Sequence, residues 1–232
     1  MHFQHSGEIW RDFPELVPGV LFAEGITDDV SAGSGTAKFM AVARSRLAGM
    51  PEGELPEIRA WRRAFSRMGL KPTQYRCASE SLLRRLRKDG CLPQVHPLVD
   101  VCNAVSVAFA IPVAVFDVSK ITGHLDVRYA AGDEDYLTFS GEVEHPRAHE
   151  VIFADRARQV HARRWTNRQS GLSAVQASTT AVLIVAEALH ASAAPDMQEL
   201  TAAIAAELHA VWFVTPMVTV LSQSSPRFTF GQ

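Results

Sequence analysis

The sequence predicts an α+β protein in which a mainly antiparallel sheet packs against helices. Before Asp117, apolar residues recur every three or four positions, which is typical of amphipathic helices. After Asp117 the period falls to two, and Gly132 and Gly141 separate short segments, which is typical of antiparallel strands. We therefore expect one sheet packed on a helix at 97–109. Its strands are expected near 113–118, 125–130, 135–139, 151–154 and 159–163.

The N-terminal third predicts a strand followed by helices. Residues 13–26 indicate a turn and an edge strand. Helical spacing follows at 37–47 and 56–68, with Gly49 and Gly69 as the expected C-terminal stops. A further helix is expected from about 78 to 88.

In the C-terminal part, residues 179–189 are apolar enough for a buried strand or helix. Residues 195–212 predict an amphipathic helix, and the tail at 215–230 indicates a last strand. We expect a single domain over 1–232. Its parts are an N-terminal strand and helical extension (1–70), a core (71–190), and a C-terminal helix and tail (191–232).

Composition limits the classes of function. The chain has 23 basic and 25 acidic residues, so any nucleic-acid contact must come from a local patch. Three cysteines without CxxC spacing argue against a disulfide framework and a zinc site, and favour a reducing cytoplasm. The first residues lack the order of a signal peptide, and no apolar run reaches membrane-spanning length. We expect a cytoplasmic protein with no metal, no cofactor and no membrane partner.

A polar strip on the predicted helix 97–109 is the first candidate site. Pro97 suits the first helical turn, and Asp100, Asn103 and Ser106 share the face opposite the apolar one. His96 enters this helix and is the most plausible candidate for a base. The alternative is structural: Asp100 caps a loop and Asn103 binds backbone, since buried polar groups are mostly satisfied ones.

Two arginine-bearing segments are candidate phosphate contacts. The densest basic run is 84–88, with Arg76 just ahead of its helix. The alternative is a solvated helix end whose cations complement the helix dipole. In the segment 160–171, Trp165 flanked by arginines suits stacking on an unpaired base. The alternative, which the sequence favours equally, is that Trp165 fills a core position and its indole N–H is hydrogen-bonded.

The stretch 99–133 resembles the B3/B4 domain, the tRNA-editing module in the beta subunit of phenylalanyl-tRNA synthetase. The matching residues keep the internal spacing of the family's signature, and the glycine usual before Pro112 is replaced here. They are Val99, Asp100, Asn103, Pro112, Phe116, Asp117, Lys120, Ile121, Gly123, Val127, Arg128, Ala130 and Gly132. The segment 163–173 is similar to the RRWNxRQSxxT motif of free-standing relatives, from which Thr166 and Ser173 depart.

The resemblance implies hydrolysis of the ester between a wrong amino acid and the terminal ribose of tRNA. Such a site needs a positioned water, a side-chain pocket and donors for the oxyanion, and we expect it between helix 97–109 and the loop 163–171. The family's pocket histidine is Ala114 here, and its loop with an acidic residue is replaced by 165–172, so tyrosine specificity is not implied.

Each candidate residue receives a role under this interpretation. The catalytic candidates are His96, Asn103 and Ser106. The substrate-binding candidates are Asp100, Ala114, Phe116, Trp165, Asn167 and Gln169. The RNA-binding candidates are Arg76, Arg84, Arg163, Arg164 and Arg168.

The leading hypothesis is a trans-editing hydrolase that binds the acceptor end of misacylated tRNA, with no DNA partner. The alternative is a non-catalytic module that binds tRNA, a nucleoside or an amino-acid derivative. A third is an unrelated small-molecule enzyme on the same fold, since fold does not fix function. Aminoacylation motifs are absent from the sequence, so we do not expect an aminoacyl-tRNA ligase.

Overall fold

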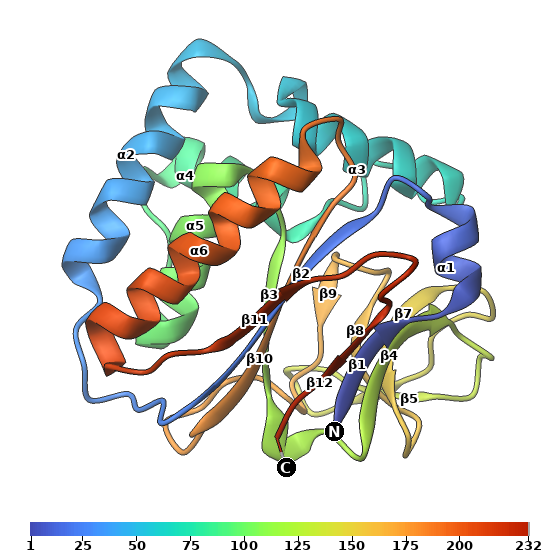
Figure 1. Ribbon diagram of the computed structural model, residues 1–232. Helices are drawn as coiled ribbons and strands as arrows, with labels where there is room; N and C mark the ends of the chain where they lie inside the picture. The colour runs from blue at the N-terminus through green and yellow to red at the C-terminus, as the bar shows by residue number, and fades with distance from the viewer. Residues whose placement is uncertain (232) are drawn as a thin grey trace.

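The computed structural model describes residues 1–231 and contains two β-sheets with helices around them (Figure 1). The larger sheet, sheet A, has eight strands in the order β12-β1-β4-β7-β8-β5-β6, with β9 beside β8. Its neighbours are antiparallel except for β1 with β4 and β5 with β8. Its strands are β1 (His2–His5), β4 (His124–Tyr129), β5 (Asp135–Leu137), β6 (Val143–Glu144), β7 (Val151–Asp155), β8 (Gln159–Arg163), β9 (Arg168–Gln169) and β12 (Arg227–Thr229).

The smaller sheet, sheet B, has four antiparallel strands in the order β11-β2-β10-β3. The strand β10 pairs along its whole length with β2 and over a shorter stretch with β3, so it lies inside the sheet. The four strands are β2 (Val17–Glu24), β3 (Val113–Asp117), β10 (Ala181–Ala188) and β11 (Met217–Val220).

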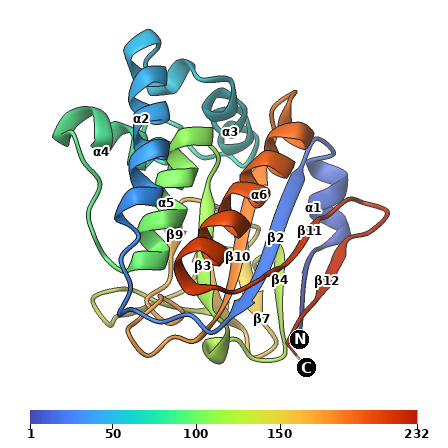
Figure 2. The same cartoon turned by 60° about the vertical axis from the view of Figure 1, so that its left-hand side comes forward.

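Both faces of sheet B are buried, because β10 alternates between two cores. Val182 and Ile184 belong to the core formed with the helices, whereas Leu183 and Val185 belong to the core shared with sheet A. Figure 2 shows α5 and α6 in front of sheet B, with strands of sheet A behind it. The apolar run in β10 follows from burial on both faces.

The helices lie mainly on the outer face of sheet B, where α2 packs on α5 and α6 packs on β2. No helix in residues 1–231 combines the length and apolar character needed to cross a membrane. The α-helices are α1 (Gly7–Asp12), α2 (Gly33–Gly49), α3 (Pro56–Arg67), α4 (Ala78–Asp89), α5 (Pro97–Phe109) and α6 (Ala193–Trp212). Short 3-10 turns lie at Glu52–Glu54 and Val118–Lys120.

The α+β class is confirmed, and α5 covers the predicted residues, with Pro97 in its first turn and His96 as N-cap. The prediction of one sheet is wrong, because β3 pairs with β10 in sheet B while the other four predicted strands lie in sheet A. The strand within 13–26 is not an edge strand, since β2 lies between β10 and β11. Both errors concern partners far apart in sequence, which local periodicity does not encode.

The contact between β2 and α6 depends on Gly19. A Cβ atom there would lie 2.5 Å from Sδ of Met197 and 2.6 Å from Cγ2 of Thr201. We expect Gly19→Ala to lower the free energy of unfolding by about 1–3 kcal/mol, measured by chemical denaturation. The control is Gly49→Ala in α2, where nothing lies within 4 Å, and this change should be neutral or stabilising. Equal stability of the two variants would contradict the close packing.

Candidate functional site

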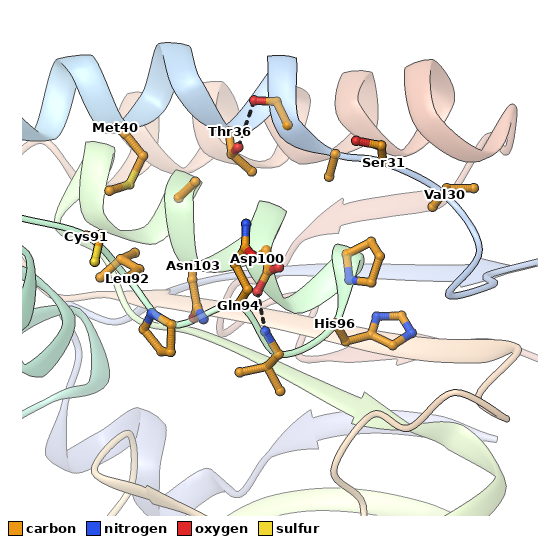
Figure 3. Close-up of a pocket in the computed structure, with 16 residues that line it drawn as sticks. Val30, Ser31, Thr36, Met40, Cys91, Leu92, Gln94, His96, Asp100 and Asn103 are labelled. Atoms are coloured by element: carbon orange, nitrogen blue, oxygen red, sulfur yellow. Dashed lines mark hydrogen bonds between the residues drawn. The ribbon is translucent and has the colours of Figure 1, made fainter.

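Two cavities hold most of the predicted site residues, and they lie on opposite sides of sheet B. The outer cavity, of about 500 Å³, lies between α2, α5 and the segment 91–96 (Figure 3). The inner cavity, of about 60 Å³, is lined by the start of β3, by residues 165–169 and by β7, β8 and β10. The expectation of one pocket between helix 97–109 and the loop 163–171 is therefore wrong, because sheet B separates them.

Three predicted residues line the outer cavity (Figure 3): His96, Asp100 and Asn103. Oδ1 of Asp100 accepts a hydrogen bond from the backbone N–H of Val95 at 3.0 Å, so this carboxylate caps the preceding loop. Nδ1 of His96 accepts from the N–H of Leu98 at 3.2 Å, and burial lowers the pKa of His96, which keeps the ring neutral at pH 7. The Asn103 amide is half-buried at the cavity wall.

Ser106 and Phe116 line neither cavity. The Ser106 side chain is fully buried, and its hydroxyl donates to the carbonyl of Ile111 at 2.6 Å. This bond closes the C-terminal end of α5, so the hydroxyl is committed to the fold. The Phe116 ring packs between the sheets, 5.5 Å from the ring of Phe153. The geometry gives both residues structural contacts, whereas the sequence suggested a catalytic role for Ser106 and a substrate contact for Phe116.

The inner cavity collects the other predicted substrate-binding residues: Ala114, Trp165, Asn167 and Gln169. The amide of Asn167 donates to the carbonyl of Arg76 at 2.8 Å, and the amide of Gln169 donates to that of Val115 at 2.6 Å. These bonds hold the segment 165–169 against β3 and against the residues just before α4.

Trp165 is a core residue. It has no exposed surface, and its ring lies 4.7 Å from Phe13 and 5.0 Å from Trp61, both edge to face. Its backbone is left-handed, with a φ of 57°, and its N–H donates to the carbonyl of Val151 at 2.8 Å. The expectation of an exposed tryptophan that stacks on a base is wrong, and the core alternative describes the structure.

Glu187 is a residue of the inner cavity that the sequence analysis missed. It lines the cavity from β10, and its exposed fraction is only 1%. Oε1 of Glu187 accepts from the indole N–H of Trp165 at 2.8 Å and lies 2.6 Å from Nε2 of His5. A buried carboxylate needs such partners, because desolvation of an unpaired charge is costly. The available signal was an acidic residue inside the apolar run 181–188.

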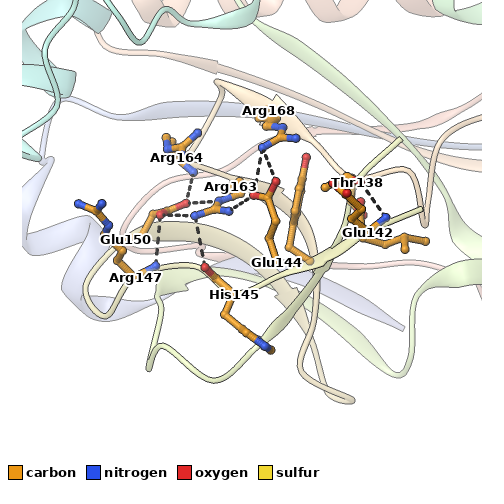
Figure 4. A network of polar contacts seen from close by, with 12 residues as sticks. Thr138, Glu142, Glu144, His145, Arg147, Glu150, Arg163, Arg164 and Arg168 are labelled. Carbon is orange, nitrogen blue, oxygen red and sulfur yellow. Dashed lines mark hydrogen bonds and ion pairs between the residues drawn. The ribbon is translucent and has the colours of Figure 1, made fainter. Parts of the chain in front are cut away.

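The predicted arginine patch is divided by the fold. Arg163 is 4% exposed, and its guanidinium donates to Glu150 at 2.8 Å and to Glu144 at 2.6 Å (Figure 4). The donors of Arg163 are thus used within the protein, so the expectation of a free phosphate contact there is wrong. Arg84 pairs with Glu52 at 3.2 Å and does not line the inner cavity.

Three predicted arginines remain beside the inner cavity. Arg168 lines it, and its half-exposed side chain pairs with Glu144 at 3.1 Å. Arg164, next to Trp165, stacks on the ring of Tyr75 at 4.8 Å. The backbone carbonyl of Arg76 accepts from the lining residue Asn167, whereas the guanidinium of Arg76 pairs with Glu80 at 3.4 Å. Carboxylates pair with the guanidiniums of Arg76 and Arg168, so the local basic surface stays a prediction.

A serine, a histidine and an aspartate also meet in the core. Nδ1 of His161 lies 2.8 Å from Oγ of Ser173, and its Nε2 lies 3.5 Å from Oδ2 of Asp155. The order is that of a nucleophilic triad, but Ser173 and His161 are completely buried and line neither cavity. A substrate ester has no path to Ser173, so the cluster acts as a core hydrogen-bond network.

One group of side chains has the composition of a metal site. Ligand atoms of Glu57, His190 and Asp196 lie within 4.8 Å of one another. However, both oxygens of Glu57 accept from Arg46 at 2.8 Å, and His190 bonds Asp196 at 2.7 Å. The groups thus satisfy one another as an ion-pair cluster.

Comparisons with known proteins match this arrangement to a family. Residues 60–201, more than half of the chain, match the family described as the B3/4 domain. The chain belongs to the B3/4 domain family.

Curated relatives are similar over a shorter stretch. The phenylalanine–tRNA ligase beta subunit of Legionella pneumophila (strain Lens) is 35% identical over 75 residues, which are 32% of this chain and 9% of that protein. The Cereibacter sphaeroides subunit is 37% identical over 76 residues, or 33% of this chain and 9% of that protein. The aligned part of this chain thus spans about a tenth of the length of these relatives.

A solved structure is similar at low identity. It is an N-terminal fragment of the phenylalanyl-tRNA synthetase beta subunit from Pyrococcus horikoshii, with a TM-score of 0.49 and 8% identity, covering 94% of this chain and 53% of that chain. Identity at this level supports no residue-by-residue correspondence.

The ion pair between Glu150 and Arg163 makes stability depend on pH. Burial alone would raise the pKa of Glu150, but the hydrogen bonds and charge of Arg163 outweigh burial and hold this pKa below its usual value. A carboxylate with a depressed pKa stabilises the fold above its unfolded pKa, and the contribution is lost as pH falls through the folded pKa.

We expect Glu150→Gln to lower the free energy of unfolding at pH 7 by about 1.5–3 kcal/mol, the usual value for a hydrogen bond to a charged group. The difference from the unmodified protein should shrink as pH falls below about 4. Urea unfolding at a series of pH values measures it. A difference that is the same at pH 7 and pH 3 would contradict the assignment.

Proposed function

We propose that this B3/4 domain binds the acceptor end of tRNA and hydrolyses an amino acid esterified to the terminal ribose. The observation that carries the proposal is the inner cavity, which the buried carboxylate of Glu187 and the side chain of Arg168 both line, with Arg164 next to the lining residue Trp165. The curated relatives are subunits of a tRNA ligase, which makes an RNA-linked substrate the first class to test.

Charge favours the inner cavity over the outer one. Asp100 lines the outer cavity, and no arginine or lysine is among its described lining residues. Phosphate contacts dominate the affinity of proteins for nucleic acids, and Arg168 lines the inner cavity directly. Glu187 also lines the inner cavity, so the phosphate contact that we expect is at Arg168.

Hydrolysis needs a water, a place for the acyl group and donors for the acyl oxygen. The water oxygen bonds to the acyl carbon, the bond from that carbon to the ribose oxygen breaks, and the ribose oxygen takes a proton. Ala78 lines the cavity at the N-terminus of α4, whose positive dipole end favours the developing negative charge. Thr166 also lines it, and its hydroxyl is buried without a partner among the described residues.

A non-catalytic binding module is the second candidate. Its supporting observation is that no histidine, cysteine or serine is among the described residues that line the inner cavity. Such a module would hold an aminoacyl-tRNA end without supplying a nucleophile or a general base. Multiple turnover by the purified protein would exclude it.

The arginines predict how RNA binding depends on salt. We expect Arg164→Ala and Arg168→Ala each to weaken binding of aminoacyl-tRNA and to reduce the slope of log K against log salt concentration by about 0.7, the value for one phosphate contact with a single strand. Arg227→Ala is the control, because Arg227 lies on the outer strand β12 and bonds Gln4. An unchanged slope in both arginine variants would count against the basic surface.

A matched pair of variants tests which cavity performs hydrolysis. We expect Ala114→Leu, which fills the inner cavity, to reduce single-turnover deacylation of a panel of aminoacyl-tRNAs by about 100-fold or more, as loss of positioning does. Asn103→Ala, in the outer cavity, should retain the rate. Thermal unfolding checks that both variants fold. If Asn103→Ala loses the rate and Ala114→Leu retains it, hydrolysis takes place in the outer cavity and involves Asn103, as the sequence alone suggested.

A further inference from the structure

The size of the inner cavity restricts what it can hold. Its volume is about 60 Å³, whereas a cavity that binds benzene measures about 150 Å³ and one water needs about 10–15 Å³ of such space. The cavity thus holds about four to six non-hydrogen atoms, and a phenylalanine or tyrosine side chain is larger than that.

The apolar walls cannot readily retreat to enlarge the cavity. Trp165 is fixed by its indole bond to Glu187 and by edge-to-face packing on Phe13 and Trp61. Phe153, on the same wall, is 1% exposed and stacks near Phe3 at 6.1 Å. Rotating Trp165 outward would break its hydrogen bond and leave a void in a close-packed core.

The polar part of the lining sets the chemistry of a small ligand. Oε1 of Glu187 already has two partners, the indole N–H of Trp165 and Nε2 of His5. Both hydrogen bonds to the Glu187 side chain in the described range 1–231 reach Oε1, which leaves the second oxygen, Oε2, for a ligand. A carboxylate oxygen only accepts, so the ligand group that matches it is a donor such as a hydroxyl.

We propose that the acyl group taken by the inner cavity is a small amino acid with a side-chain hydroxyl, of the size of serine or threonine, and that aromatic acyl groups are excluded. This assignment rests on the proposed function and names its substrate class. Hydrogen bonds to a charged group discriminate by about 10–100-fold, so a ligand with the hydroxyl is preferred by that factor over an isostere without it.

The experiment is a deacylation assay of the full chain with tRNAs carrying serine, threonine, alanine, valine, phenylalanine or tyrosine. Threonine and valine are the decisive pair, because they have the same shape and differ in the hydroxyl. We expect kcat/KM for the threonyl ester to exceed that for the valyl ester by about 10–100-fold. Phenylalanyl and tyrosyl esters should not exceed the uncatalysed rate.

Two variants separate the roles of charge and volume. Glu187→Gln should reduce the ratio of threonyl to valyl rates towards one, because the amide is a weaker acceptor. Val185→Ala, which removes two methyl groups from the wall, should raise the rates with valyl and larger esters relative to the threonyl ester. The second variant keeps the test informative if Glu187→Gln does not fold.

The outcomes test the proposed substrate class and the proposed function separately. Hydrolysis of phenylalanyl or tyrosyl esters as fast as the threonyl ester would overturn the substrate class while the proposed function stands. Equal rates for threonyl and valyl esters would do the same, and would indicate that Glu187 binds the α-ammonium group common to all amino acids. No hydrolysis of any ester by the unmodified protein would overturn both.

Discussion

The buried carboxylate of Glu187 is the interaction on which the rest of the structure depends. An ion of this kind in a protein interior costs several kcal/mol unless it is paired and hydrogen-bonded, and here the partners come from separate elements. His5 on β1 and Trp165 bind its side chain, while the indole of Trp61 on α3 donates to its backbone carbonyl at 3.3 Å. Sheet A, sheet B and a helix are therefore joined at one point, which forms the back of the inner cavity.

The segment 164–165 shows what this junction holds in place. Arg164 and Trp165 have φ values of 49° and 57°, a left-handed conformation that non-glycine residues rarely adopt. Such backbone persists only where surrounding contacts fix it. The bonds from Trp165 to Glu187 and to Val151 provide those contacts. The same two residues place an arginine beside the cavity and an apolar wall inside it.

Local signals predicted much of the fold, whereas the site depended on distant partners. Helix 97–109 follows from Pro97 and apolar spacing, which are properties of neighbouring residues. The burial of Arg163 depends on Glu144 and Glu150, which approach it only after the sheet forms. An arginine in a polar segment resembles a surface residue until those partners are known. Glu187 was missed for the same reason, since its partners lie 182 and 22 residues away.

The central claim is that the aminoacyl end occupies the inner cavity. The most direct test is NMR of the labelled protein with a non-hydrolysable threonyl amide of 3′-amino-adenosine. The account predicts shifts of the Trp165 indole N–H and the Gln169 side-chain amide, with the Asn103 amide unchanged. Shifts at Asn103 with Trp165 and Gln169 unaffected would contradict it and place the ligand in the outer cavity.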